Sequence, residues 1–121
     1  KVHGFTDRVD LFLEAADLLV GKAGGLTSSE AMARGVPIVA VRPIPGQEER
    51  NCDYLQESGA AVRVHDLFDL HVRLTHFLGN RADLERMQAN ARAIGRPDSA
   101  FRVARSILSR LTPPGTGATM P

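Results

Sequence analysis

The stretch DLLVGKAGGLTSSEAMARGVPIVAV, residues 17–41, decides the fold of this chain. Its two apolar runs, 17–22 and 36–41, are too short for helices and rich in branched side chains, which predicts two buried strands. Between them, Thr27-Ser28-Ser29-Glu30 has the Ser/Thr-x-x-Glu pattern of a capping box, and Gly35 ends the helix that it predicts. A strand, a helix and a strand in this order predict a parallel pair joined by a right-handed crossover.

The sequence on either side continues the alternation of strands and helices. We expect helices at 8–16 with Asp7 as a cap, at 47–58, at 66–78, at 81–94 and from Asp98 to 111, and a third strand at 60–64 nearer an edge. The fold class predicted is α/β, a partial Rossmann-like parallel sheet with flanking helices. In the last helix, one face is apolar and is expected to pack on the core; its residues are Phe101, Ala104, Ile107, Leu108 and Leu111. Residues 112–121 are expected to be a disordered tail.

Length and composition restrict the chain to one ordinary domain. It has 121 residues, of which 43% are hydrophobic and 24% charged, as expected for a globular interior. Its single cysteine, Cys52, excludes an internal disulfide and is expected to be a buried small apolar residue. The longest apolar run, 36–41, is far shorter than a membrane span. Because the chain begins Lys1-Val2-His3 without Met or a signal-peptide pattern, we expect it to be part of a longer protein.

Charge is distributed unevenly along the chain. Residues 81–121 hold 7 arginines against 3 acidic residues, a net +4, whereas residues 1–80 hold 8 basic and 11 acidic residues, a net −3. A basic segment fits a solvated helix face or contact with an anionic membrane surface. Nucleic acid is not expected as a partner, because Phe101 is the only aromatic residue of the segment. The four histidines, His3, His65, His71 and His76, have no metal-ligand spacing, so no metal site is expected.

Two loops carry the residues suited to binding. Gly24 and Gly25 come just before a helix, where backbone amides and the helix dipole favour a phosphate near Thr27; the alternative is a tight turn with Thr27 as a simple cap. The polar run Gln47-Glu48-Glu49-Arg50-Asn51 opens the next helix and suits the hydroxyls of a sugar; the alternative is that its acids only complement the helix dipole. Both loops follow strands of one parallel sheet, so we expect them on the same rim, facing one ligand.

The chain also resembles a known family. The segments VHGFTD (2–7), GGLTSSEA (24–31) and above all PGQEERN (45–51) resemble the C-terminal half of bacterial diacylglycerol glucosyltransferases and plant-type monogalactosyldiacylglycerol synthases, and more broadly the MurG-type GT-B glycosyltransferases. The resemblance runs over residues 1–111, which would be part of the C-terminal, UDP-sugar-binding domain of such an enzyme. Within this larger family, the resemblance to the enzymes that use a lipid acceptor rests mainly on residues 45–51.

The resemblance implies a role for ten residues in binding a UDP-hexose donor. Uracil would meet the backbone at Phe5 and Thr6, and Glu30 would bind the ribose. The diphosphate would lie at Gly24, Gly25, Leu26 and Thr27, and the hexose at Gln47, Glu48 and Asn51. The catalytic base and the lipid acceptor would be supplied by an N-terminal lobe, so no catalytic residue is expected in this chain. No cofactor and no metal would be required.

The function that follows is hexosyl transfer from a UDP-sugar to a diacylglycerol-type lipid, in an enzyme that is cytoplasmic and peripheral to the membrane. Compared with the family, the N-terminal lobe and two strands of the donor lobe are absent; the piece at Val2 would be the third strand, and an apolar sheet edge would be exposed. We therefore expect the chain alone to be inactive. The alternative is a noncatalytic UDP-sugar-binding subunit that completes a site on a partner chain. A UDP-sugar epimerase or hydrolase fits residues 45–51 less well.

Overall fold

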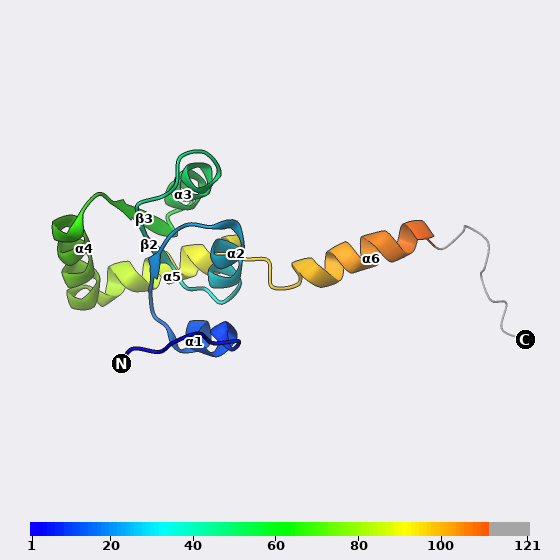
Figure 1. Ribbon diagram of the computed structural model, residues 1–121, viewed down its shortest axis with the longest axis horizontal. Helices are drawn as coiled ribbons and strands as arrows, with labels where there is room; N and C mark the ends of the chain where they lie inside the picture. Colours follow the sequence, from blue (N-terminus) through cyan, green and yellow to red (C-terminus); the bar gives the residue numbers. More distant parts are fainter. Residues whose placement is uncertain (112–121) are drawn as a thin grey trace, which may run out of the picture.

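The computed structural model describes residues 1–111, which form a small parallel sheet with helices on both faces (Figure 1). The elements are α1 (Val9–Ala15), β1 (Leu19–Gly21), α2 (Gly25–Ala33), β2 (Ile38–Val41), α3 (Gln47–Glu57), β3 (Ala61–Val64), α4 (Leu67–Gly79), α5 (Arg81–Ile94) and α6 (Ser99–Leu111). The strand order is β1-β2-β3, and both pairs are parallel, with Val39 of β2 opposite Val20 on one side and Val62 on the other.

This architecture confirms the predicted fold class. Each strand is followed by a helix, and the two helices that connect neighbouring strands, α2 and α3, contact each other. β2 is the central strand and is buried from Ile38 to Ala40, whereas β3 lies at an edge, as its weaker apolar pattern predicted. β1 is the other edge among the described residues, and its Val20 is 41% exposed. The expected apolar edge is therefore present.

The core has a separate cluster on each face of the sheet. On one face α2, α3 and the C-terminal half of α5 pack against Ile38 and Ala40 of β2. On the other face α4 and the N-terminal half of α5 bury Val39 and Val64, with Phe77 and Met87 as the largest helical contributors. Cys52 is fully buried within the first cluster, as predicted. Because α5 contributes to both clusters, it fixes the two helical layers relative to each other.

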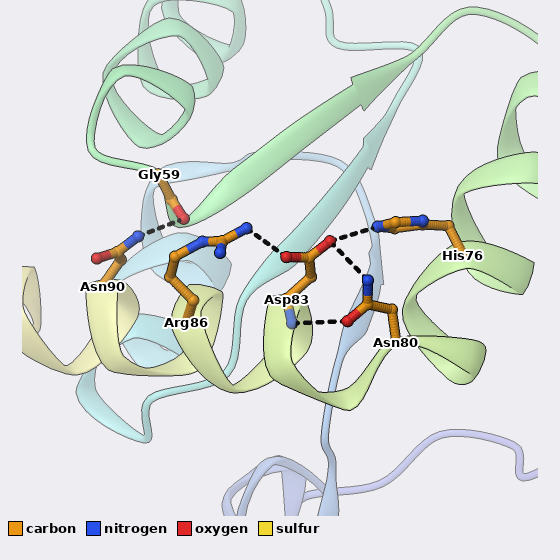
Figure 2. Close-up of polar contacts among 6 residues, drawn as sticks. All are labelled: Gly59, His76, Asn80, Asp83, Arg86 and Asn90. Atoms are coloured by element: carbon orange, nitrogen blue, oxygen red, sulfur yellow. Dashed lines mark hydrogen bonds and ion pairs between the residues drawn. The ribbon is translucent and has the colours of Figure 1, made fainter.

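The end of α5 lies against α2 at very short range. A Cβ added to Gly95 would be 2.2 Å from the carbonyl oxygen of Met32, so only glycine allows this approach. A second tie joins α5 to the turn before β3, where Asn90 Nδ2 donates a hydrogen bond to the carbonyl oxygen of Gly59 at 3.1 Å (Figure 2). The position of the chain directly after Gly95 is therefore set by backbone packing.

Three expectations about the ends of the chain are wrong. The segment around Val2 is not a strand, because its backbone has no neighbouring strand to pair with among residues 1–111; Val2 is 98% exposed. The N-cap of α1 is Arg8 and not Asp7, because the helix begins at Val9; Thr6 Oγ1 accepts a hydrogen bond from the Arg8 amide at 3.0 Å. The apolar face of α6 does not pack on the core. Figure 1 shows α6 extending away from the sheet, and none of its residues is buried.

Helix α6 is amphipathic, as predicted, but no other element of residues 1–111 buries its apolar face. Its largest exposed apolar side chains are Phe101, Val103, Ile107, Leu108 and Leu111. The pattern thus predicted the helix correctly and its burial wrongly, because a sequence pattern identifies a face and not the surface that covers it. The tail predicted at 112–121 lies outside the described residues.

Candidate functional site

The two loops predicted to share a rim are joined by a hydrogen bond. Asn51, in the first turns of α3, donates from Nδ2 to the carbonyl oxygen of Ala23 at 3.0 Å, across 28 residues of sequence. Ala23 is fully buried and directly precedes the glycines at the start of α2. The loops that follow β1 and β2 therefore lie side by side, as predicted, and that they face one ligand stays a prediction.

The start of α2 is open to a ligand. Gly24 is the N-cap, and the first hydrogen bond within the helix runs from the Ser28 amide to the Gly24 carbonyl at 2.8 Å. The amides of residues 25–27 thus precede the helical bonding pattern. A Cβ built at Gly24 or Gly25 would have no atom within 4 Å, so the space beside this turn is free. Together with the helix dipole, the free amides make this end of α2 suitable for an anion.

The capping box predicted at Thr27-Ser28-Ser29-Glu30 is wrong. α2 begins at Gly25, so these residues lie in its first two turns instead of at its boundary. Ser29 Oγ donates to the Gly25 carbonyl at 2.8 Å, while Thr27 and Glu30 are exposed and make no side-chain hydrogen bond to any residue in 1–111. The physical reason is that Gly24 has the extended backbone of an N-cap, with φ of −66° and ψ of 153°, and Gly25 is already helical, so the helix starts before Thr27. The Glu30 carboxylate is consequently available to a ligand.

Glu30 lies on the side of α2 that faces α1. Together with Asp7, Asp10 and Arg34 it lines a cavity of about 410 Å³ between these two helices. Asp7 follows Thr6 directly, so the segment expected to meet a base and the carboxylate expected to meet a ribose border the same cavity. Within this wall, a hydrogen bond from Arg8 lowers the pKa of Asp10, which keeps that carboxylate ionised. Phe5 is fully exposed.

The polar run that opens α3 is divided between structural and free side chains. Glu48 Oε2 accepts the Ile44 amide at 2.8 Å, and Glu49 Oε2 accepts the Gly46 amide at 3.4 Å, so both acids hold the proline-rich loop. Gly46 has φ of 102°, a conformation that glycine allows this loop to adopt. Gln47 is exposed and has no side-chain hydrogen bond within the described residues. Of the three residues expected at the hexose, Gln47 is therefore free, Glu48 keeps one unoccupied oxygen, and Asn51 is committed to the loop tie.

A polar cluster at the junction of α4 and α5 was not predicted from the sequence. Figure 2 shows the Asp83 carboxylate between three partners: His76 Nε2 lies 2.7 Å from Oδ2, Asn80 Nδ2 donates to the same oxygen at 3.1 Å, and Arg86 pairs with Oδ1. Hydrogen bonds, first from His76 and then from Arg86, lower the pKa of Asp83. No cluster of three metal-binding side chains occurs in residues 1–111. The available sequence signal was the Asn-x-x-Asp pattern 80–83, which is a helix cap.

The fold is that of a Rossmann-like α/β domain, and the comparisons with known proteins agree. The chain belongs to the glycosyl transferases group 1 family, whose sequence pattern matches residues 1–94. MurG of Acinetobacter baumannii has the same architecture, with a TM-score of 0.76 and 28% identity over 90% of this chain and 33% of that protein. The chain therefore has the fold of the C-terminal region of a GT-B glycosyltransferase.

Proteins with similar sequences give a more specific comparison. The processive diacylglycerol beta-glucosyltransferase of Bacillus subtilis (strain 168) is 32% identical over 108 residues, and that of Bacillus mycoides is 32% identical over 109. These matches cover 89% and 90% of this chain but only 28% of each relative, so the chain spans less than a third of their length. The glycosyltransferase of kitacinnamycin, with 23% identity and a TM-score of 0.67, supports the fold alone. No helix among residues 1–111 is long and apolar enough to span a membrane.

Proposed function

We propose that this chain is the donor-binding part of an enzyme that transfers a hexose from a UDP-sugar to a diacylglycerol-type lipid. The observation that carries the proposal is the Asn51 to Ala23 hydrogen bond, which holds the open start of α2 and the polar start of α3 at one rim. The relatives named as diacylglycerol glucosyltransferases support the lipid acceptor. The remaining lobe, in the same or a separate chain, supplies the acceptor site and the catalytic base.

The donor is assigned along the rim in three parts. The diphosphate lies at Gly24, Gly25, Leu26 and Thr27, where the free amides and helix dipole stabilise the charge that develops on the leaving group, without a required metal or cofactor. The ribose hydroxyls donate to Glu30, whose carboxylate has no partner within residues 1–111, and uracil lies at Phe5 and Thr6. The hexose meets Gln47 and the free oxygen of Glu48. Asn51 contributes by fixing the loop geometry.

The transfer itself is proposed to proceed with inversion. A hydroxyl of the lipid, deprotonated by a base of the other lobe, attacks the anomeric carbon of the hexose as the bond to the diphosphate oxygen breaks. The released UDP carries the negative charge, which the start of α2 stabilises more strongly than the charge of the intact donor. This difference between transition state and ground state is what accelerates the reaction.

The enzymatic proposal is tested on the longest natural polypeptide that contains this chain. It is incubated with diacylglycerol and a panel of UDP-hexoses, and the lipid product is identified by mass spectrometry. A hexosylated diacylglycerol is the expected product. UDP-sugar binding without any product, even with lipid present, would instead favour the alternative of a noncatalytic UDP-sugar-binding subunit.

The ribose assignment is tested by Glu30→Gln. The Glu30 side chain makes no hydrogen bond within the described chain, so the variant should unfold within about 0.5 kcal/mol of the wild type. It should bind UDP roughly tenfold more weakly, about 1.4 kcal/mol, because an amide replaces a carboxylate acceptor. A 2′,3′-dideoxyribose analogue of UDP should bind both proteins about equally. Equal affinity for UDP itself would remove Glu30 from the site.

Peripheral attachment to the cytoplasmic membrane surface is part of the proposal. Arg96, Arg102, Arg105 and Arg110 form no ion pair within residues 1–111, whereas Arg81 and Arg86 pair with Glu85 and Asp83. Each arginine that reaches an anionic surface would contribute about 1 kcal/mol. Sedimentation with anionic and neutral vesicles measures the effect. Equal binding to both vesicle types, insensitive to salt, would contradict an electrostatic attachment.

A further inference from the structure

A second cavity lies on the side of α2 that faces α3, and it meets the proposed donor site only at Gly25 and Asn51. It measures about 430 Å³ and lies between α2, α3 and the link that joins α5 to α6. Its floor is apolar, with Met32, Leu55 and Ile94. Its polar wall is formed by Gly25, Ser28, Ser29, Asn51, Tyr54, Arg96 and Ser99. We refer to it as the α2–α3 cavity. It is separate from the Glu30 cavity, which faces α1.

The α2–α3 cavity carries one uncompensated positive charge. Arg96 is its only charged residue, and its single side-chain hydrogen bond in the described chain goes to the neighbouring carbonyl of Gly95 at 3.2 Å. The position of Arg96 is fixed by the packing of the preceding residue. Gly95 is packed so closely on Met32 that the backbone of the link is fixed beside α2, where Figure 1 shows the link leaving α5.

A buried polar group of the same wall is also unsatisfied. Ser28 is only 7% exposed, and its Oγ has no hydrogen-bond partner within the described residues. A buried hydroxyl without a partner is unfavourable by about 1–3 kcal/mol, and most such groups in proteins have one. The Ser29 hydroxyl already donates its proton to the Gly25 carbonyl, so its oxygen can accept a hydrogen bond but the hydroxyl cannot donate a second one. Ser28 therefore has an unused donor and lines the same cavity as Arg96.

We infer that the α2–α3 cavity binds a phosphate monoester with a small apolar organic group. The guanidinium of Arg96 pairs with the phosphate as a fork of two N–H donors, and Ser28 supplies a hydroxyl after rotation about its side-chain bond. These donors exceed what the two oxygens of a carboxylate take up, whereas a phosphate monoester has three free oxygens. The organic group covers Met32, Leu55 and Ile94.

The test uses phenyl phosphate and inorganic phosphate as probes, titrated calorimetrically into the longest natural polypeptide that contains this chain. Phenyl phosphate should bind with one-to-one saturation and more tightly than inorganic phosphate, since only the former reaches the apolar floor. Arg96→Gln should weaken phenyl phosphate at least tenfold, and Ser28→Ala several-fold. Arg102→Gln, a matched loss of one arginine that does not line the cavity, should leave the affinity unchanged. Thermal unfolding of each variant establishes that it is folded.

The experiment also separates this site from the donor site. Saturating UDP should leave phenyl phosphate binding intact, and Arg96→Gln should bind UDP as the wild type does. Competition between UDP and phenyl phosphate would show that the probe occupies the donor site and would overturn the inference. Non-saturable binding, or equal losses in Arg96→Gln and Arg102→Gln, would overturn it as well. Loss of UDP binding in Glu30→Gln concerns the proposed function only, so the two hypotheses fail independently.

Discussion

The role that the sequence suggested for Asn51 differs from the role that it has in the structure. In the sequence it belongs to a polar run suited to a sugar; in the structure its amide holds the Ala23 carbonyl at 3.0 Å. Asn51→Ala leaves that buried carbonyl without its partner, which should lower the free energy of unfolding by about 1–3 kcal/mol. UDP binding should weaken too, because the glycine turn at the start of α2 is no longer held. Urea unfolding and UDP titration measure the two effects.

Gln47→Ala is the matched control for Asn51→Ala. Gln47 is exposed and makes no side-chain hydrogen bond within residues 1–111, so its unfolding free energy should stay within about 0.5 kcal/mol of the wild type. If Asn51→Ala unfolds like Gln47→Ala, the loop tie contributes nothing and Asn51 returns to the hexose as a direct contact.

A second residue, Gly95, sets how closely α5 approaches α2. A methyl group there would lie 2.2 Å from the Met32 carbonyl oxygen, so Gly95→Ala forces the backbones apart. Overpacking of this kind should cost about 1–3 kcal/mol of stability. Gly79→Ala is the control, since a Cβ at Gly79 meets nothing within 4 Å; it should be neutral or slightly stabilising. Denaturant melts compare the two, and equal stabilities would contradict the close packing.

At the scale of elements, the α4–α5 junction depends on one ionised carboxylate. The pKa of Asp83 lies below its ordinary value of 3.8 in the folded protein, because His76 and Arg86 stabilise the charged form. A lowered folded-state pKa means that the stabilisation is complete above the unfolded value and is lost as the pH falls through the folded value. The stability difference between wild type and Asp83→Asn should thus be present at about pH 7 and shrink towards about pH 3.

Chemical denaturation at several pH values checks this expectation. A difference that stays constant between these pH values would mean that the junction is held by the Asn80 cap and helix packing, and that the charge of Asp83 contributes little. Asp98→Asn, whose carboxylate forms no ion pair within residues 1–111, is the matched control for the loss of one acidic side chain.

Some helices and strands were predicted from the sequence more accurately than others. Helices α3 and α5 begin and end within a residue or two of the expected positions, because Gly59 and Gly95 punctuate strongly periodic segments. The start of α2 moved forward, since a glycine pair can both cap a helix and open it, which a search for side-chain caps does not detect. The Asn51 to Ala23 tie and the Asp83 cluster depend on the meeting of separate segments, about which local sequence patterns carry no information.

At the scale of the molecule, the described chain presents two incompletely covered apolar surfaces. One is the β1 edge with Val20, and the other is the face of α6 with Phe101 and Ile107. Apolar patches and unpaired edges promote association in water. The isolated 121-residue chain should therefore form oligomers or a molten state, measured by size-exclusion chromatography with light scattering and by thermal unfolding. A sharp monomer peak with cooperative unfolding would contradict this.

A pair of neighbouring substitutions identifies the contribution of α6 to that association. Ile107→Glu places a charge on the apolar face and should shift the chain towards smaller species, whereas Ser106→Glu adds the same charge beside it and should have less effect. If both variants associate as the wild-type chain does, the sheet edge and not α6 is responsible.

The exposure of α6 has a consequence for its own persistence. None of the 13 residues of α6 is buried, so packing contributes little to this helix, and isolated helices of this length are marginal in water. Its amide hydrogens should consequently exchange with solvent far faster than those of α5, whose Leu84, Met87 and Ala91 are buried. When another surface binds the apolar face of α6, the helix should become more stable. The helical circular dichroism signal should then increase, so this signal reports on assembly.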